Sequence, residues 1–82
     1  MKGTTCRFVC EPQFCEELGM LEPKPCYQNR LLEIVEAACR DRVRLHGCGY
    51  SFARIFWKRK LMVWYEANDG EVTLLSIRTD LL

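Results

Sequence analysis

The sequence predicts an α+β fold: an N-terminal strand, two helices, and then a three-stranded antiparallel meander. Three observations support this prediction. Residues 53–80 alternate between apolar and polar side chains, bend at an Asn-Asp-Gly turn, and alternate again, as paired strands do. Residues 30–45 repeat their apolar side chains at helical spacing. Residues 4–10 alternate like a further strand.

The length of the chain limits what it can do. A domain of 82 residues buries only about 60% of its unfolded surface, which leaves little core for a deep enzyme pocket. With 49% hydrophobic residues, 3 Pro, 5 Gly and no repeat, residues 1–82 are expected to form a single domain. Function is therefore expected on a surface.

The N-terminal residues carry no secretion signal. They lack the apolar run of roughly 7–15 residues that a signal peptide requires. No stretch of about 18 consecutive apolar residues could span a membrane either. A cytoplasmic protein without membrane contact is expected.

The first helix should be short and the second long. Pro12 suits a first helical turn, and Gly19 is a candidate C-cap. Pro23 and Pro25 interrupt the helical pattern and bias the residues before them, Glu22 and Lys24, toward extended backbone.

Asn29 is the expected N-cap of the long helix, and Gly47 or Gly49 should end it. The stripe that faces the core is then Leu31, Val35, Ala38, Cys39 and Val43.

Three strands are predicted at 51–57, 61–67 and 71–78, joined by three-residue bends, with Gly70 left-handed. Trp57 would then face Leu61, and Ala67 would face Glu71. That register places on the core side Ala53, Ile55, Trp57, Leu61, Val63, Tyr65, Thr73, Leu75 and Ile77. The opposite side mixes cations with large apolar groups: Phe52, Arg54, Phe56, Met62, Trp64, Glu66, Val72, Leu74, Ser76 and Arg78. A face of that kind is either a recognition surface or a second buried layer.

Charge is unevenly distributed, although the net charge is only +1. Residues 1–36 contain 4 basic and 6 acidic residues, residues 37–60 contain 7 and 1, and residues 61–82 contain 1 and 4. The net charges of the three segments are therefore −2, +6 and −3. The basic residues of the middle segment are Arg40, Arg42, Arg44, Arg54, Lys58, Arg59 and Lys60. Such a block attracts phosphates or an acidic partner, unless it is an ordinary solvated surface.

The six cysteines, Cys6, Cys10, Cys15, Cys26, Cys39 and Cys48, are expected to be reduced and mostly buried, because no secretory signal accompanies them. Paired C-x-x-C knuckles are lacking, so no metal or other cofactor is expected, although His46 and Cys48 could form half of a zinc site. The same two residues are the only candidates for a Cys–His nucleophile.

The last forty residues contain a series of short motifs. They are "LHG" at 45–47, "ARI" at 53–55, "VWYE" at 63–66, "NDG" at 68–70 and "EVTLLSI" at 71–77. With the element order, this series resembles the RelE/ParE superfamily of toxins from bacterial toxin–antitoxin pairs. The resemblance covers almost the whole chain in element order, but each motif is short.

The resemblance implies that the chain, if an enzyme, is a metal-independent mRNA endoribonuclease whose cations stabilise the scissile phosphate. Arg54 matches the family's first basic position, and Lys58, Arg59 and Lys60 occupy the loop beside it. Leu61 and Met62 stand where the family often has an aromatic–Arg step, and the basic, tyrosine-containing tail of many of its nucleases is not seen. The resemblance is therefore closer to non-catalytic members, such as ParE-like gyrase inhibitors, or to a degenerate relative.

Two hypotheses for function follow. In the first, a toxin-like protein binds the ribosome and mRNA, or gyrase, through Arg54, Lys58, Arg59, Lys60 and Arg78, and an antitoxin is its natural partner. In the second, a small non-enzymatic interaction or inhibitor protein, such as one carried by a phage, binds another protein through Phe52, Phe56, Met62 and Trp64, because aromatic residues and Met are enriched at interface centres. No small-molecule ligand is expected in either case.

Overall fold

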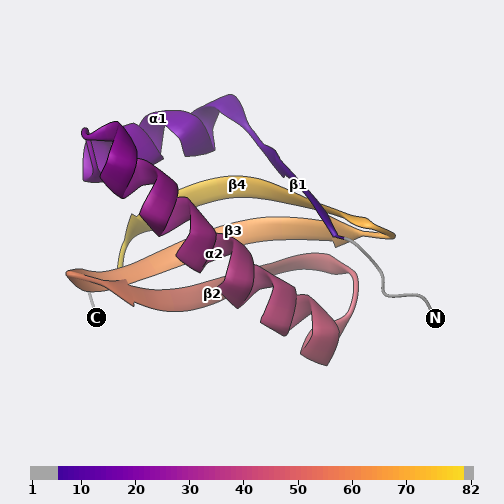
Figure 1. The fold of residues 1–82 in the computed structure, drawn as a ribbon. Coiled ribbons are helices and arrows are strands. Elements are labelled where there is room, and N and C mark those ends of the chain that lie inside the picture. The colour runs from indigo at the N-terminus through magenta and orange to yellow at the C-terminus, as the bar shows by residue number, and fades with distance from the viewer. Residues whose placement is uncertain (1–5, 81–82) are drawn as a thin grey trace.

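The computed structural model describes residues 6–80, and the α+β class and the order of the elements are as predicted (Figure 1). The elements in chain order are β1 (Arg7–Cys10), α1 (Pro12–Leu21), α2 (Pro25–His46), β2 (Gly49–Trp57), β3 (Arg59–Asn68) and β4 (Glu71–Thr79). Within the described residues, β1 covers only Arg7–Cys10 of the strand that was predicted at 4–10. Residues 4 and 5 of the predicted strand lie outside the described residues.

The sheet has four strands in the order β1-β4-β3-β2. Strands β2, β3 and β4 form an antiparallel meander, and β1 joins it by pairing parallel to β4. The sheet is therefore mixed and one strand larger than the predicted meander. The α1–α2 segment supplies the long crossover that a parallel neighbour requires.

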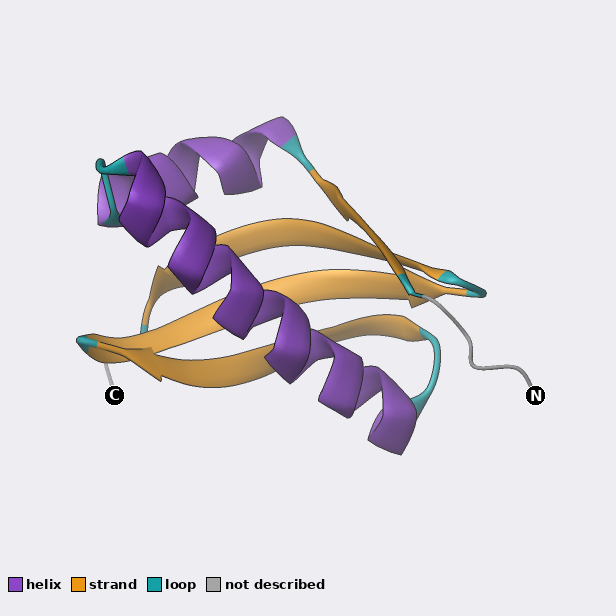
Figure 2. Cartoon of the chain, in the orientation of Figure 1, coloured by secondary structure: helices purple, strands orange, loops and turns teal. Residues whose placement is uncertain are grey.

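The two helices pack on the same sheet face and share one core (Figure 2). Helix α2 crosses over β2 and β3, while α1 lies against β4. The buried apolar residues are Phe14, Leu18, Leu31, Val35, Cys39, Ala53, Leu61, Val63, Tyr65, Ala67, Val72, Leu74 and Ile77. Within residues 6–80 no helix covers the opposite face of the sheet.

The β2–β3 hairpin is tighter than predicted. Trp57 pairs with Arg59 instead of Leu61, so a single residue, Lys58, makes the bend with a φ of 62°. The register error is two residues, and side chains alternate with a period of two. The predicted faces of β2 and β3 are therefore confirmed, although the pairing was wrong.

The β3–β4 hairpin departs further from the prediction. Gly70 is left-handed as expected (φ 77°), but Asn68 pairs with Glu71 across a two-residue turn. This one-residue shift exchanges the two faces of β4, so Val72 and Leu74 are fully buried, whereas Thr73 and Leu75 are not part of the core.

A β-bulge then restores the expected orientation. Tyr65 pairs with Leu74, and Trp64 pairs with Ser76, which leaves Leu75 as the extra residue. Beyond it, Ile77 is buried as predicted. The bulge thus lets one strand contribute residues of both parities to the core.

Both helices extend beyond their predicted bounds. Gly19 lies inside α1, whose C-cap is Glu22, and Asn29 lies inside α2, which begins at Pro25. Proline is well suited to the first helical position, because its missing N–H would have no partner there. Gly47 ends α2 with a φ of 81°, as expected.

Candidate interaction face

The sheet face that points away from the helices, called the open face below, is the candidate site. Its side chains are Tyr50, Phe52, Arg54, Phe56, Lys60, Met62, Trp64, Glu66, Ser76 and Arg78. Tyr50 and Phe56 are 76% and 72% exposed, and Phe52 is 38% exposed. Tyr50 was missed by sequence reasoning because the predicted strand began at 51, although its alternation with Phe52 could have revealed it.

Strand pairing arranges the open face in rows. One row runs Phe52, Trp64, Ser76 across β2, β3 and β4. The next row runs Arg54, Met62, Arg78 across the same strands. Directly paired residues have their Cβ atoms about 5 Å apart, so Met62 lies between the two arginine residues. Phe52, Trp64 and Met62 are thus in neighbouring rows, and Phe56, paired with Lys60, lies one row beyond Arg54 on the same face.

Arg54 is held in place by two neighbours. Its Nε donates a hydrogen bond to Asp80 Oδ2 at 3.0 Å, and its guanidinium carbon lies 5.7 Å from the centre of the Phe52 ring. The Asp80 side chain is only 8% exposed, and its backbone N–H donates to the Lys60 carbonyl at 2.8 Å. Sequence reasoning did not identify Asp80.

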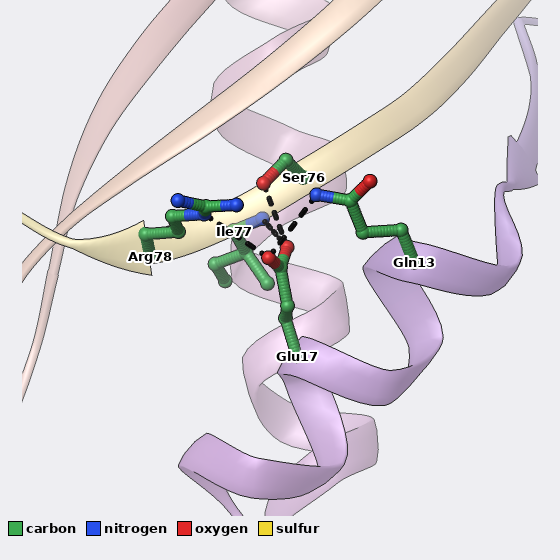
Figure 3. A network of polar contacts seen from close by, with 5 residues as sticks. All are labelled: Gln13, Glu17, Ser76, Ile77 and Arg78. Carbon is green, nitrogen blue, oxygen red and sulfur yellow. Dashed lines mark hydrogen bonds and ion pairs between the residues drawn. The ribbon is translucent and has the colours of Figure 1, made fainter.

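Arg78 is paired with Glu17 of α1 at 3.1 Å (Figure 3). The same carboxylate accepts hydrogen bonds from Ser76 Oγ at 2.7 Å, from the Ile77 backbone N–H at 3.0 Å and from Gln13 Nε2 at 3.3 Å. Burial alone would raise the pKa of Glu17, but these hydrogen bonds together lower it. Glu17 therefore fixes α1 and the orientation of Arg78 at one border of the open face.

Lys58 has a local structural role. Its Nζ donates to Glu22 Oε2 at 2.8 Å and lies 4.7 Å from the centre of the Tyr27 ring. Trp57 Nε1 donates to the same Glu22 oxygen at 3.0 Å. The Lys58 bond, followed by the Trp57 bond, lowers the pKa of Glu22, which is almost fully buried. These bonds tie the β2–β3 bend to the segment between the helices.

The predicted cationic set is thus divided. Arg54, Lys58 and Arg78 are neutralised by carboxylates of the same chain, whereas Arg59 and Lys60 form no ion pair within residues 6–80. Lys60 also lines a hollow of about 560 Å³. The hollow is bordered by Arg54, Ile55, Phe56, Lys60 and Asp80.

The remaining cations of the +6 block lie elsewhere. One group lies near the C-terminal end of α2, which leads into the start of β2: Arg40, Arg42 and Arg44 (Figure 1). The other group follows the opposite end of β2: Lys58, Arg59 and Lys60. A strand of nine residues spans roughly 30 Å. The block is therefore spread along the length of β2 instead of forming one patch, and Arg42 and Arg54 meet at Phe52 between its two ends.

The six cysteines are free, but the expectation that most are buried is wrong. Only Cys39 is buried; Cys6 and Cys10 are half-buried, and the other three are exposed because they lie on helix surfaces or in the loop after α2. Burial raises the pKa of Cys39 to about 12 and that of Cys10 to about 11, with a further contribution from Cys15 to the latter. His46 is exposed, and no cluster of three His, Cys, Asp or Glu residues within 6–80 is arranged to hold a metal ion.

Comparison with known proteins does not place the chain: no family model matches it, and no curated protein or solved structure is significantly similar to it. The resemblance to the RelE/ParE superfamily remains a prediction from the motifs. In the described part of the chain, no helix is both long and apolar enough to cross a membrane.

Proposed function

We propose that this chain is a non-enzymatic binding protein that docks onto another protein through the open face. The observation that carries the proposal is the high exposure of Tyr50 and Phe56 on a sheet face that neither helix covers. Aromatic residues, Met and Arg are enriched at the centres of protein interfaces, and the open face combines all three.

The charge of the open face favours a protein over a phosphate backbone. Arg54, Lys60 and Arg78 contribute three positive charges, Arg42 adds a fourth beside Phe52, and Glu17, Glu66 and Asp80 contribute three negative charges at or beside the same surface. Binding to nucleic acid relies on cations that neutralise phosphates, and here two of the four are already neutralised. A balanced, aromatic surface is better suited to a protein partner.

The two arginines also limit the entropy lost on binding. Asp80 engages Nε of Arg54, and Glu17 engages Nε of Arg78, so each side chain is restricted by a bond at Nε, and its outer nitrogens make no hydrogen bond within residues 6–80. Preorganised side chains lose less rotamer freedom when a partner binds. Such arginines suit carbonyl or carboxylate acceptors on the partner.

The proposal is tested by capturing partners from cell extract with the wild type, Phe56→Ser and Met20→Ser. Met20 is 81% exposed and lies on α1, outside the strands that form the open face, so it controls for general stickiness. A protein that is retained by the wild type and Met20→Ser, lost by Phe56→Ser, and insensitive to a roughly tenfold rise in salt supports the proposal. Equal capture by all three proteins contradicts it.

A second candidate is the toxin-like function, acting on the ribosome and mRNA or on gyrase. The observation in its favour is that Arg59 and Lys60, which lack ion pairs within residues 6–80, lie at the bend beside Arg54. In that case an antitoxin would cover the open face, and any RNA cleavage would proceed without a metal ion.

This candidate is tested by induced expression of the wild type, Arg54→Ala and a triple alanine variant at 58–60. Growth arrest that these substitutions relieve supports a toxin, and the process that fails first, translation or DNA supercoiling, identifies the target. Normal growth with soluble wild-type protein rejects it.

A further inference from the structure

The two edges of the sheet are protected to different degrees. On the β1 side the edge strand has only four residues, and it covers β4 only from Glu71 to Leu74. Where β1 stops, Glu17 of α1 takes over and accepts the hydrogen bond from the Ile77 backbone N–H. A short edge strand and a covering helix are two recognised ways of preventing unwanted strand pairing.

The β2 side has little of this protection. Strand β2 is nine residues long and is the terminal strand of the sheet, so one row of its backbone groups has no partner strand within residues 6–80. It contains no proline and no lysine, and its one charged residue, Arg54, is neutralised by Asp80. An edge with these properties is a template for a further strand.

A helix and a cation border this edge. In Figure 1 the C-terminal end of α2 projects beyond β2, and Leu45 near that end is 78% exposed. Arg42 reaches from α2 toward the strand and lies 5.8 Å from the centre of the Phe52 ring. Its Nε is buried but makes no hydrogen bond in the described part of the chain.

The unsatisfied Nε indicates the chemistry of the missing neighbour. A buried donor without an acceptor costs about 1–3 kcal/mol, and a carboxylate is the strongest acceptor for a guanidinium. Lys and Arg predominate at this end of α2: Arg40, Arg42 and Arg44 are accompanied there only by Asp41, which is paired with Arg44. An acidic side chain beside Phe52 would therefore find a partner in Arg42.

A second copy of this chain is a poor candidate for that neighbour. Antiparallel pairing of β2 with itself would place a two-fold axis near the middle of the strand. Arg42 and Arg54 both lie against Phe52 there, so four guanidinium groups would meet around the axis, of which only the two of Arg54 are paired with a carboxylate within residues 6–80. Like charges in direct opposition are destabilising.

We infer that the free edge of β2, overhung by the C-terminal end of α2, binds an extended acidic segment of another protein by strand addition. Backbone hydrogen bonds to β2 would supply affinity, and a carboxylate opposite Phe52 would pair with Arg42. Residues of the segment that face α2 would be apolar, because Leu45 lies on that side. This site goes beyond the proposed function, since it uses the edge of the sheet and not its open face.

The test selects peptides of about nine residues from a random display library on the full-length wild type and on Arg42→Glu. We expect the wild type to enrich alternating apolar peptides with Asp or Glu at one position, and Arg42→Glu to enrich Lys or Arg there. Amide exchange of the wild type with a selected peptide should slow about tenfold or more at alternate residues of β2, those whose N–H groups face away from β3. A melting curve checks that Arg42→Glu is folded, and Arg42→Ala, expected to bind without charge preference, replaces it if it is not.

Failure to enrich peptides, or enriched peptides that leave β2 exchange unchanged, overturns the inference. The same acidic preference in wild type and variant would also overturn the role of Arg42. Either outcome is distinguishable from failure of the proposed function, because capture by the open face depends on Phe56 and is measured separately.

Discussion

Arg54 and Asp80, 26 residues apart in the sequence, meet through a hydrogen bond of 3.0 Å from Nε to a carboxylate oxygen of Asp80, whose side chain is only 8% exposed. The pair connects β2 to the end of β4 across the middle strand β3. It neutralises the cation that the motif comparison singles out, and it fixes that cation on the open face. The same bond therefore serves both the stability of the sheet and the shape of the candidate site.

Arg54→Ala should lower the free energy of unfolding by about 1 kcal/mol, because the ion pair with Asp80 is lost but Arg54 is more than half exposed and water can replace it. Arg59→Ala is the matched control: it lies at the bend between the same two strands, has no ion pair within residues 6–80, and should change stability by less than about 0.5 kcal/mol. Urea unfolding of both variants measures the difference. A loss of several kcal/mol in Arg54→Ala would mark the residue as essential to the fold.

Glu17 should make stability depend on pH in the acidic range. Its pKa in the folded protein lies below the ordinary value of 4.5, so its contribution is fully present above pH 4.5 and is lost as pH falls through the lower, folded value. Glu17→Gln should remove this part of the acid sensitivity and cost about 1–2 kcal/mol near neutral pH, since one oxygen can still accept from Ile77.

The measurement is urea unfolding at neutral pH and below pH 4.5. Glu16→Gln is the control, because Glu16 neighbours Glu17 on α1 but is exposed and makes no hydrogen bond through its side chain in the described part of the chain. The prediction is wrong if Glu17→Gln loses as much stability on acidification as the wild type and Glu16→Gln do.

Alternation in the sequence was enough to predict which side chains share the open face. Phe52, Phe56, Met62 and Trp64 were placed correctly even though the β2–β3 register was off by two residues, because that error preserves the parity of both strands. The parity of β4 could not be predicted in the same way. The bulge at Leu75 involves no glycine or proline, so nothing in the local sequence marks it.

The ionic partners of the face were also beyond sequence reasoning. Glu17 and Arg78 are 61 residues apart, and their meeting depends on β1 pairing beside β4 and on α1 turning back along the uncovered part of that strand. A four-residue strand carries too little pattern to show which neighbour it will choose. The cations could therefore be identified from the sequence, but not their neutralisation.

Lys58 should be replaceable by glycine more readily than by alanine. Its φ of 62° is a left-handed conformation that costs about 1 kcal/mol for a residue with a Cβ and almost nothing for glycine. Both substitutions remove the bond to Glu22, so the difference between their unfolding free energies isolates the backbone contribution. We expect the free energy of unfolding of Lys58→Gly to exceed that of Lys58→Ala by about 1 kcal/mol, as measured by thermal or urea unfolding. Equal free energies of unfolding would contradict backbone strain at this bend.

The exposed aromatic residues should be dispensable for folding. Phe56→Ser and Tyr50→Ser each remove a side chain that is more than 70% exposed, so each should change the free energy of unfolding by less than about 0.5 kcal/mol. Val63→Ser is the contrasting variant, because Val63 lies on the same hairpin but is fully buried, and its loss should cost about 2 kcal/mol or more. Urea unfolding of the three variants distinguishes a free recognition surface from a second buried layer. If Phe56→Ser were as destabilising as Val63→Ser, the aromatic side chains would belong to the core, and the open face would lose its claim to be the binding site.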